Sequence, residues 1–177
     1  MESVLRAVRW LALGALLACA HALPPPGPPM EAPAELTELQ GSHPAYYYQL
    51  AAELFKAGRK DDALFTFYLG QLRYRTLLLA HPDAPKDGDP AVFTTLSERI
   101  GRPLNEYASA DVANWVRTID GVLAYDRDHP DKFISPAEYP EQSAQTRKGL
   151  AAFRDKLLED PERVQKIRHA NGLENRN

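Results

Sequence analysis

Residues 47–70 read YYQLAAELFKAGRKDDALFTFYLG, and this stretch decides the fold. Apolar side chains recur every three or four residues on both sides of Gly58, which is the spacing of one face of an α-helix. Gly58 stands where the first apolar stripe stops, and glycine is the residue that most often follows a helix end. Asp61 and Asp62 then suit the positive end of a second helix dipole. The sequence therefore predicts two helices joined by a short turn.

The second of these helices is apolar on two sides. One apolar stripe consists of Phe65, Tyr68, Leu69, Leu72 and Leu79. The other consists of Ala63, Phe67, Gly70, Tyr74 and Leu78. A helix with two apolar sides is packed by neighbours on both. We expect this helix to lie at the centre of the domain and to end at His81-Pro82, because a proline disfavours helical backbone in the residue before it.

The rest of the chain outside the N-terminus is also helical in pattern. The first helix begins at Ser42-His43-Pro44, and further helices are predicted over 91–100, over a longer segment capped by Ser109, over 143–158, and from Asp160-Pro161 to Asn171-Gly172. Loops are predicted over 81–90 and 127–142. No alternating run of β-branched residues is long enough for a sheet. The fold class is therefore predicted to be all-α, a compact domain of five or six helices over residues 42–172.

Residues 47–70 resemble a single tetratricopeptide unit, which is a helix-turn-helix of about 34 residues. The matching positions are Tyr47, Leu50, Ala51, Leu54, Gly58, Ala63, Phe67 and Gly70. The proline that ends the unit comes late, at Pro82, because the second helix runs on. The resemblance implies a helical hairpin in a domain that binds protein, and it implies no catalytic activity.

The N-terminus has the features of an export signal. Residues 1–22 read MESVLRAVRWLALGALLACAHA, with Arg6 and Arg9 ahead of a short apolar run. That order is typical of a secretory signal peptide, and the run is shorter than the roughly 20 residues that span a bilayer. Localisation is predicted to be outside the cytoplasm, in the periplasm.

Two processing sites remain open within this signal. Ala20-His21-Ala22 fits a small-x-small cleavage site that would release a soluble chain. Residues 16–19, LLAC, resemble a bacterial lipobox, which would make residues 1–18 the signal and Cys19 a lipidated first residue. In the second case the protein would be anchored to the membrane through the lipid on Cys19.

Residues 23–41 follow as a proline-rich segment. Six of the eleven residues from Leu23 to Pro33 are proline. Such a segment favours a stiff, solvated, polyproline-like conformation. We expect a tether over 23–41 that is exposed and does not pack on the domain.

Several kinds of chemistry have no signature in the sequence. The net charge is -3, so nothing indicates nucleic acid as a partner. The histidines show no pair at i, i+4, and the only cysteine lies in the export signal, so no metal site and no cofactor are predicted. No nucleophile elbow or phosphate-binding glycine loop is present, and no catalytic residue is assigned. A catalytic group assembled only in the folded state, as in a small hydrolase, is a third reading.

The tripeptide His-Pro-Asp occurs twice, at 81–83 and 129–131. With Tyr74-Arg75 before it, the first copy resembles the J-domain signature of co-chaperones. The preceding helix has no basic excess, and the second copy indicates that the tripeptide simply ends helices here. We therefore do not predict a J-domain.

These observations favour an exported, non-enzymatic protein that binds another protein. Residues 57–75, AGRKDDALFTFYLGQLRYR, resemble helical exported lipoproteins that act as antidotes, or immunity proteins, to bacterial toxins. The alternative is a structural or adaptor lipoprotein of a cell-envelope assembly. Tyrosine and arginine are common anchors of protein interfaces. The predicted partner-binding residues are therefore Tyr46, Tyr48, Arg73 and Arg75 on the first hairpin, facing an acidic partner.

Overall fold

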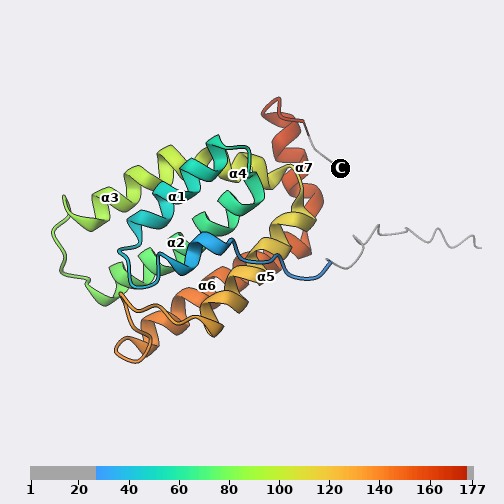
Figure 1. The fold of residues 1–177 in the computed structure, drawn as a ribbon. Helices are drawn as coiled ribbons and strands as arrows, with labels where there is room; N and C mark the ends of the chain where they lie inside the picture. Colours follow the sequence, from blue (N-terminus) through green and yellow to red (C-terminus); the bar gives the residue numbers. More distant parts are fainter. Residues whose placement is uncertain (1–26, 175–177) are drawn as a thin grey trace, which may run out of the picture.

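The computed structural model describes residues 27–174, and every regular element in that range is helical (Figure 1). The elements are the short 3-10 turn η1 (Ala34–Thr37), α1 (Ala45–Lys56), α2 (Lys60–Ala80), α3 (Asp89–Leu96), the π-helical turn η2 (Ser97–Gly101), α4 (Arg102–Ser109), α5 (Val112–Asp128), α6 (Pro140–Glu159) and α7 (Pro161–Ala170). Because α3, η2 and α4 follow one another without a break, the described chain forms six helical segments after η1. The predicted all-α fold is confirmed.

The helices α1 and α2 form the hairpin that the sequence predicts. Gly58 ends α1 with a φ of 84°, a left-handed conformation that glycine adopts without strain. Gly70 brings the two helices together, since a Cβ there would lie 2.6 Å from the Cβ of Tyr47. The hairpin therefore depends on glycine at two places, once for its turn and once for its close packing.

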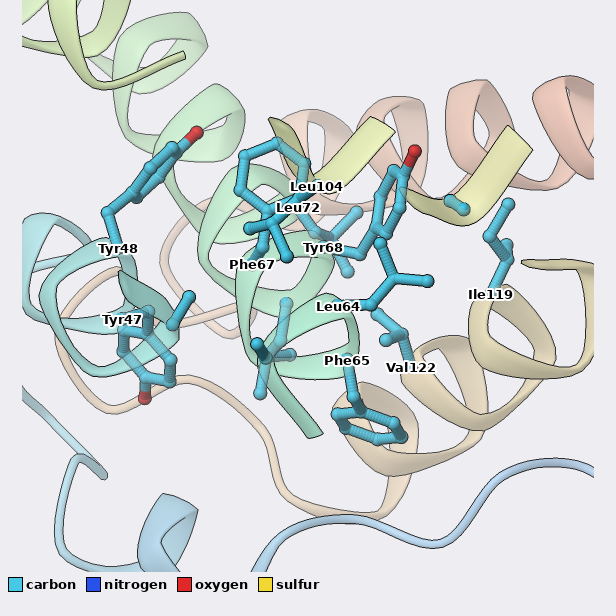
Figure 2. Close-up of a cluster of buried hydrophobic side chains, with 14 of the residues drawn as sticks. Tyr47, Tyr48, Leu64, Phe65, Phe67, Tyr68, Leu72, Leu104, Ile119 and Val122 are labelled. Atoms are coloured by element: carbon cyan, nitrogen blue, oxygen red, sulfur yellow. The ribbon is translucent and has the colours of Figure 1, made fainter. Parts of the chain in front are cut away.

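The core is built around α2, which neighbours cover along most of its length (Figure 2). All residues from Ala63 to Gly70 are buried. Helices α1, α5 and α6 all contact α2. Phe67, which lies on one of the two predicted apolar stripes of α2, is buried, and so is Trp115 of α5. The expected central position of α2 is confirmed.

The predicted tether is wrong over much of its length, because residues 28–39 pack on the domain. We call these residues the N-terminal strap. The Met30 N–H donates to the carbonyl of Arg117 (3.0 Å), and Leu36 is only 1% exposed. Gly121 makes room for the strap, as a Cβ there would lie 2.3 Å from the Met30 oxygen. The apolar side chains of the strap, such as Met30 and Leu36, pack on the domain without the three- or four-residue spacing of a helix. The spacing of apolar residues in the sequence therefore does not predict this packing.

The helix ends agree with the sequence at both His-Pro-Asp tripeptides. His81 follows α2 with φ -126° and ψ 66°, and His129 follows α5 with φ -128° and ψ 73°. Each histidine N–H donates to a carbonyl four residues back, at Leu77 and Tyr125. The tripeptide therefore ends both helices with the same backbone geometry.

Two predicted boundaries in the middle of the chain are wrong. Gly101 lies within the helical run, where its missing Cβ leaves space for the ring of Phe67. Ser109 is the last residue of α4, and the cap of α5 is Asp111, whose side chain accepts from the Asn114 N–H at 2.9 Å. Tertiary packing against Phe67 thus overrides the usual preference of glycine for a helix end.

Candidate functional site

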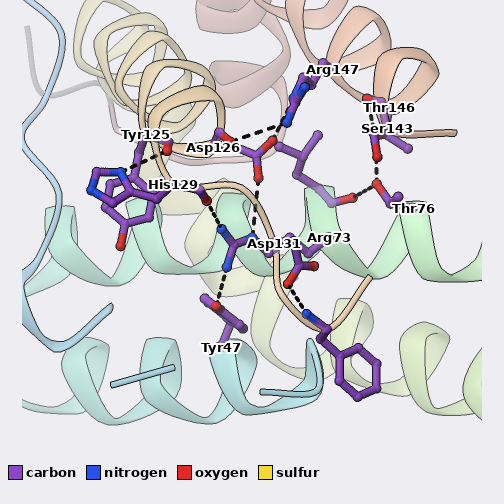
Figure 3. A network of polar contacts seen from close by, with 12 residues as sticks. Tyr47, Arg73, Thr76, Tyr125, Asp126, His129, Asp131, Ser143, Thr146 and Arg147 are labelled. Carbon is purple, nitrogen blue, oxygen red and sulfur yellow. Dashed lines mark hydrogen bonds and ion pairs between the residues drawn. The ribbon is translucent and has the colours of Figure 1, made fainter. Parts of the chain in front are cut away.

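Two regions beside α2 hold the groups that could carry function. One is a cluster of polar and charged side chains where α1, α5 and α6 meet α2, which we call the polar cluster: Tyr47, Arg73, Asp126, Asp131 and Arg147 (Figure 3). The other is an apolar groove between α2, α3 and α6.

Arg73 is the centre of the polar cluster and is only 2% exposed. Its Nε donates to Asp126 Oδ1 at 3.3 Å, and its two terminal nitrogens donate to the Tyr47 hydroxyl and to the His129 carbonyl. All three guanidinium nitrogens therefore have partners inside the protein. A buried charge needs such partners, because an unpaired one carries a large desolvation penalty.

The cluster continues on both sides of Arg73. On one side, Arg147 Nε donates to Asp126 Oδ2 at 2.7 Å. On the other, the Tyr47 hydroxyl donates to the Leu39 carbonyl at 2.8 Å, which ties the strap to the hairpin. Burial raises the pKa of Tyr47 to about 12, so this hydroxyl keeps its proton at neutral pH. The cluster joins α1, α2, α5, α6 and the strap.

Asp131 lies at the edge of the polar cluster beside a very small cavity. Its Oδ1 accepts from the Phe133 N–H at 3.0 Å, whereas its Oδ2 and the nearby Ser143 Oγ have no partner within the protein. Burial raises the pKa of the Asp131 carboxyl. The cavity that these residues line has a volume of about 10 Å³. That is about the room that one water needs, so the cluster has no space for a substrate.

Two of the four predicted partner-binding residues are buried, and the prediction that they face a partner is wrong. Arg73 belongs to the polar cluster. Tyr48 is fully buried, with edge-on ring contacts to Phe67 and Tyr74. Tyr47 and Tyr48 can both point inward because α1 is covered by α2 and also by α3. Arg73 lies three residues after Gly70, on the face turned toward α1, and this spacing is the signal that could have placed it inside.

The groove is the larger of these two regions, with a volume of about 650 Å³. The side chains from α2 that line it are Tyr68, Gln71, Leu72, Arg75, Leu78 and Leu79. Phe93 of α3 and Gln145, Thr146, Gly149, Leu150 and Phe153 of α6 complete the lining. The positions on α2 repeat at three and four residues, so the groove follows one face of that helix.

The floor of the groove is held by hydrogen bonds below it. The Tyr68 hydroxyl donates to Asn105 Oδ1 at 2.8 Å and accepts from Trp115 Nε1 at 2.8 Å. Its ring stacks against Phe153, and burial raises the pKa of Tyr68. Tyr68 therefore presents a fixed aromatic ring to the groove while its polar end is satisfied in the core.

The other two predicted partner-binding residues are exposed, in different places. Arg75 lines the groove with its guanidinium over the Phe93 ring, 5.6 Å from the centroid, and no carboxylate of residues 27–174 lies within 4.0 Å of it. Tyr46 is 53% exposed on α1 and does not line the groove. The structure therefore does not bring these two residues into one described site.

His43 and Asp89 form the one histidine-carboxylate pair of the described chain, with Nε2 3.1 Å from Oδ1. His43 Nδ1 accepts from the Ala45 N–H at 3.2 Å, so in the neutral ring Nε2 carries the proton and donates it to Asp89. Asp89 Oδ1 also accepts from the Tyr74 hydroxyl at 2.7 Å. Both ring nitrogens thus join the starts of α1 and α3, and neither is left to activate a nucleophile.

Two further features concern metals and membranes. Within residues 27–174, no group of three or more histidine, cysteine or acidic side chains is placed to hold a metal ion. The helices of the same range include none with the length and apolar character to cross a bilayer. Cys19 and the export signal lie outside the described residues, so lipidation and export stay predictions.

Comparison of the chain with protein-family models, with curated proteins and with solved structures found no match. The resemblances to a tetratricopeptide unit and to immunity lipoproteins therefore also remain predictions, and the groove is the best-supported candidate site.

Proposed function

We propose that this protein is an exported, non-enzymatic protein that binds a protein partner in the groove between α2, α3 and α6. The observation that carries the proposal is the groove itself. It leaves apolar side chains of the central helix open to solvent, with Leu79 38% exposed, although the other faces of α2 are closed. Exposed apolar surface with a polar rim marks interaction sites in soluble proteins.

The specific form of this function that we favour is an antidote to a bacterial toxin in the periplasm. An antidote needs a stable domain and a binding surface, and it needs no catalytic group. The ion pair that Arg73 makes with Asp126 and the occupied nitrogens of His43 are consistent with that requirement. An adaptor of a cell-envelope assembly would need the same features, so the identity of the partner distinguishes the two.

The test begins with photo-crosslinking in the cells that produce the protein. A photoreactive residue replaces Gln71 in the groove, and in a second sample it replaces Tyr46 on α1. The crosslinked partner is identified, purified and titrated against Leu79→Asp. We expect the Kd to rise at least about tenfold, because a charge replaces an apolar side chain at the interface.

Leu158→Asp is the matched control, since Leu158 is another exposed leucine that does not line the groove. It should leave the Kd within about twofold of wild type. A partner whose Kd rises for Tyr46→Ala and not for Leu79→Asp would contradict the groove as the interface. A partner that is toxic when produced alone supports the antidote, and a structural component of the envelope supports the adaptor.

A further inference from the structure

We infer that the occupant of the groove is an amphipathic α-helix of the partner, which packs closely against Gly149 and places an aspartate or glutamate beside Arg75. This inference rests on the proposed function and names the class of partner. Three independent observations carry it: an unexplained glycine, the length of the groove, and an arginine without a carboxylate.

The first observation is the different environment of Gly149. Gly70, Gly101 and Gly121 also lie inside helical segments, and at each of them a Cβ would meet another part of the chain within 3.0 Å. At Gly149 nothing lies within 4 Å. A glycine inside a helix is unfavourable relative to alanine, and nothing within the chain offsets that cost here. Gly149 borders the groove, where a missing side chain lets the backbone of a docked element approach.

The second observation is the length of the groove along α2. The lining residues run from Tyr68 to Leu79, which at a rise of about 1.5 Å per residue is about 16 Å, or three helical turns. A docked helix uses apolar anchors at i, i+3 or i+4, and i+7. Such anchors span about 10 Å along its axis, so three of them fit in the groove beside α2.

The third observation is the charge of the lining. Arg75 is the single charged residue among the residues that line the groove, and no carboxylate of the described chain pairs with it. Its contact with the Phe93 ring holds the guanidinium at the rim of the groove. An arginine fixed in this way can accept a carboxylate in a bidentate pair. The docked helix should therefore carry one acidic residue next to its apolar anchors.

The experiment uses a display library of helix-forming peptides of about 15 residues, because shorter helices are marginal in water. Apolar residues are fixed at i, i+4 and i+7, and the flanking positions vary among Glu, Gln, Lys and Ala. Peptides selected on the protein purified from the cells that produce it are synthesised and titrated by fluorescence anisotropy. We expect selection of Glu at one flanking position, and a Glu→Gln peptide that binds about tenfold more weakly.

Two protein variants place the peptide in the groove. Arg75→Met should weaken the Glu peptide about tenfold and leave the Gln peptide unchanged, so that the two changes are not additive. Gly149→Ala should weaken both peptides about tenfold, because its methyl group overfills the contact. The same variant should raise the Tm of the free protein by about 2–5 °C, since alanine favours the helix. Opposite effects on stability and binding separate a docking position from a folding defect.

Several results would overturn the inference. Peptides selected without an acidic residue, or bound equally by Gly149→Ala, would exclude this mode of docking. Binding of palmitate that the peptides cannot displace would assign the groove to a small apolar ligand. Dimerisation that Leu79→Asp abolishes would assign it to a second copy of the chain. If a natural partner binds Arg75→Met and Gly149→Ala as tightly as wild type, the inference of a helix docked in the groove is wrong, although the proposed protein binding still holds. If no partner protein is found, the proposed function itself is wrong.

Discussion

Arg73 and Arg75 lie two residues apart on α2, but Arg73 is buried and Arg75 is exposed. Arg73 points into a closed region where every guanidinium nitrogen meets a protein oxygen. Arg75 points into an open region lined mainly by apolar side chains. The closed side of α2 thus pairs its arginine within the protein, and the open side leaves its arginine beside exposed apolar side chains. The comparison shows that the exposed apolar surface of α2 lies on the Arg75 side, which is the side that we propose as the partner-binding surface.

The largest expected effect is the loss of stability when Arg73, on the closed side of α2, is replaced. Arg73→Met should reduce the free energy of unfolding by about 3–5 kcal/mol, because it leaves Asp126 and the Tyr47 hydroxyl with fewer partners in the interior. Arg75→Met is the matched control and should change stability by less than about 0.5 kcal/mol. Urea denaturation of both variants measures the difference. Equal losses would show that the two arginines do not differ as described.

A second pair of variants compares glycines on the two sides. Gly70→Ala should cost about 1–3 kcal/mol, because the new methyl group overlaps the Cβ of Tyr47. Gly149→Ala should stabilise the free protein by up to about 1 kcal/mol, because its methyl group meets nothing. Thermal unfolding should show shifts of opposite sign. A loss of stability at both positions would mean that the groove is closed by a part of the chain.

The smallest effect concerns Asp131, and it depends on pH. The native protein binds a proton at this carboxyl more tightly than the unfolded chain does, because burial raises its pKa. The contribution of Asp131 to the free energy of unfolding therefore falls as the pH rises above about 4. The fall begins at the pKa of Asp131 in the unfolded chain and ends above its higher pKa in the native protein. Asp131→Asn should gain stability relative to wild type from pH 3 to pH 7, by no more than about 1 kcal/mol.

Asp83 supplies the control for this measurement. It holds the same place in the other His-Pro-Asp tripeptide, and its side chain is exposed. Asp83→Asn should leave the unfolding free energy unchanged over the same range. A gain at Asp131 that does not vary with pH would contradict relief of a buried charge as its cause.

The parts of the fold that could be predicted are those with local causes. The spacing of apolar residues and the glycines at 58 and 70 lie within the hairpin, so they predict its turn and its packed face. The burial of Arg73 depends on Asp126 and His129, more than 50 residues away, and no local pattern contains those partners. The groove depends on how α6 meets α2 at long range. Sequence therefore placed Arg75 on the surface but could not place it in a groove.

The strap bears on the order in which the protein can fold. Arg117 Nε donates to the Pro28 carbonyl, across 89 positions of the chain. The strap leaves the ribosome before α1, but the part of its binding surface that lies on α5 is made only after α1 to α4 have been synthesised. Closing so long a loop costs entropy that only a formed surface can offset. The hairpin of α1 and α2 can close early and bind the strap at Leu39, whereas Pro28 and Met30 meet their partner on α5 only later.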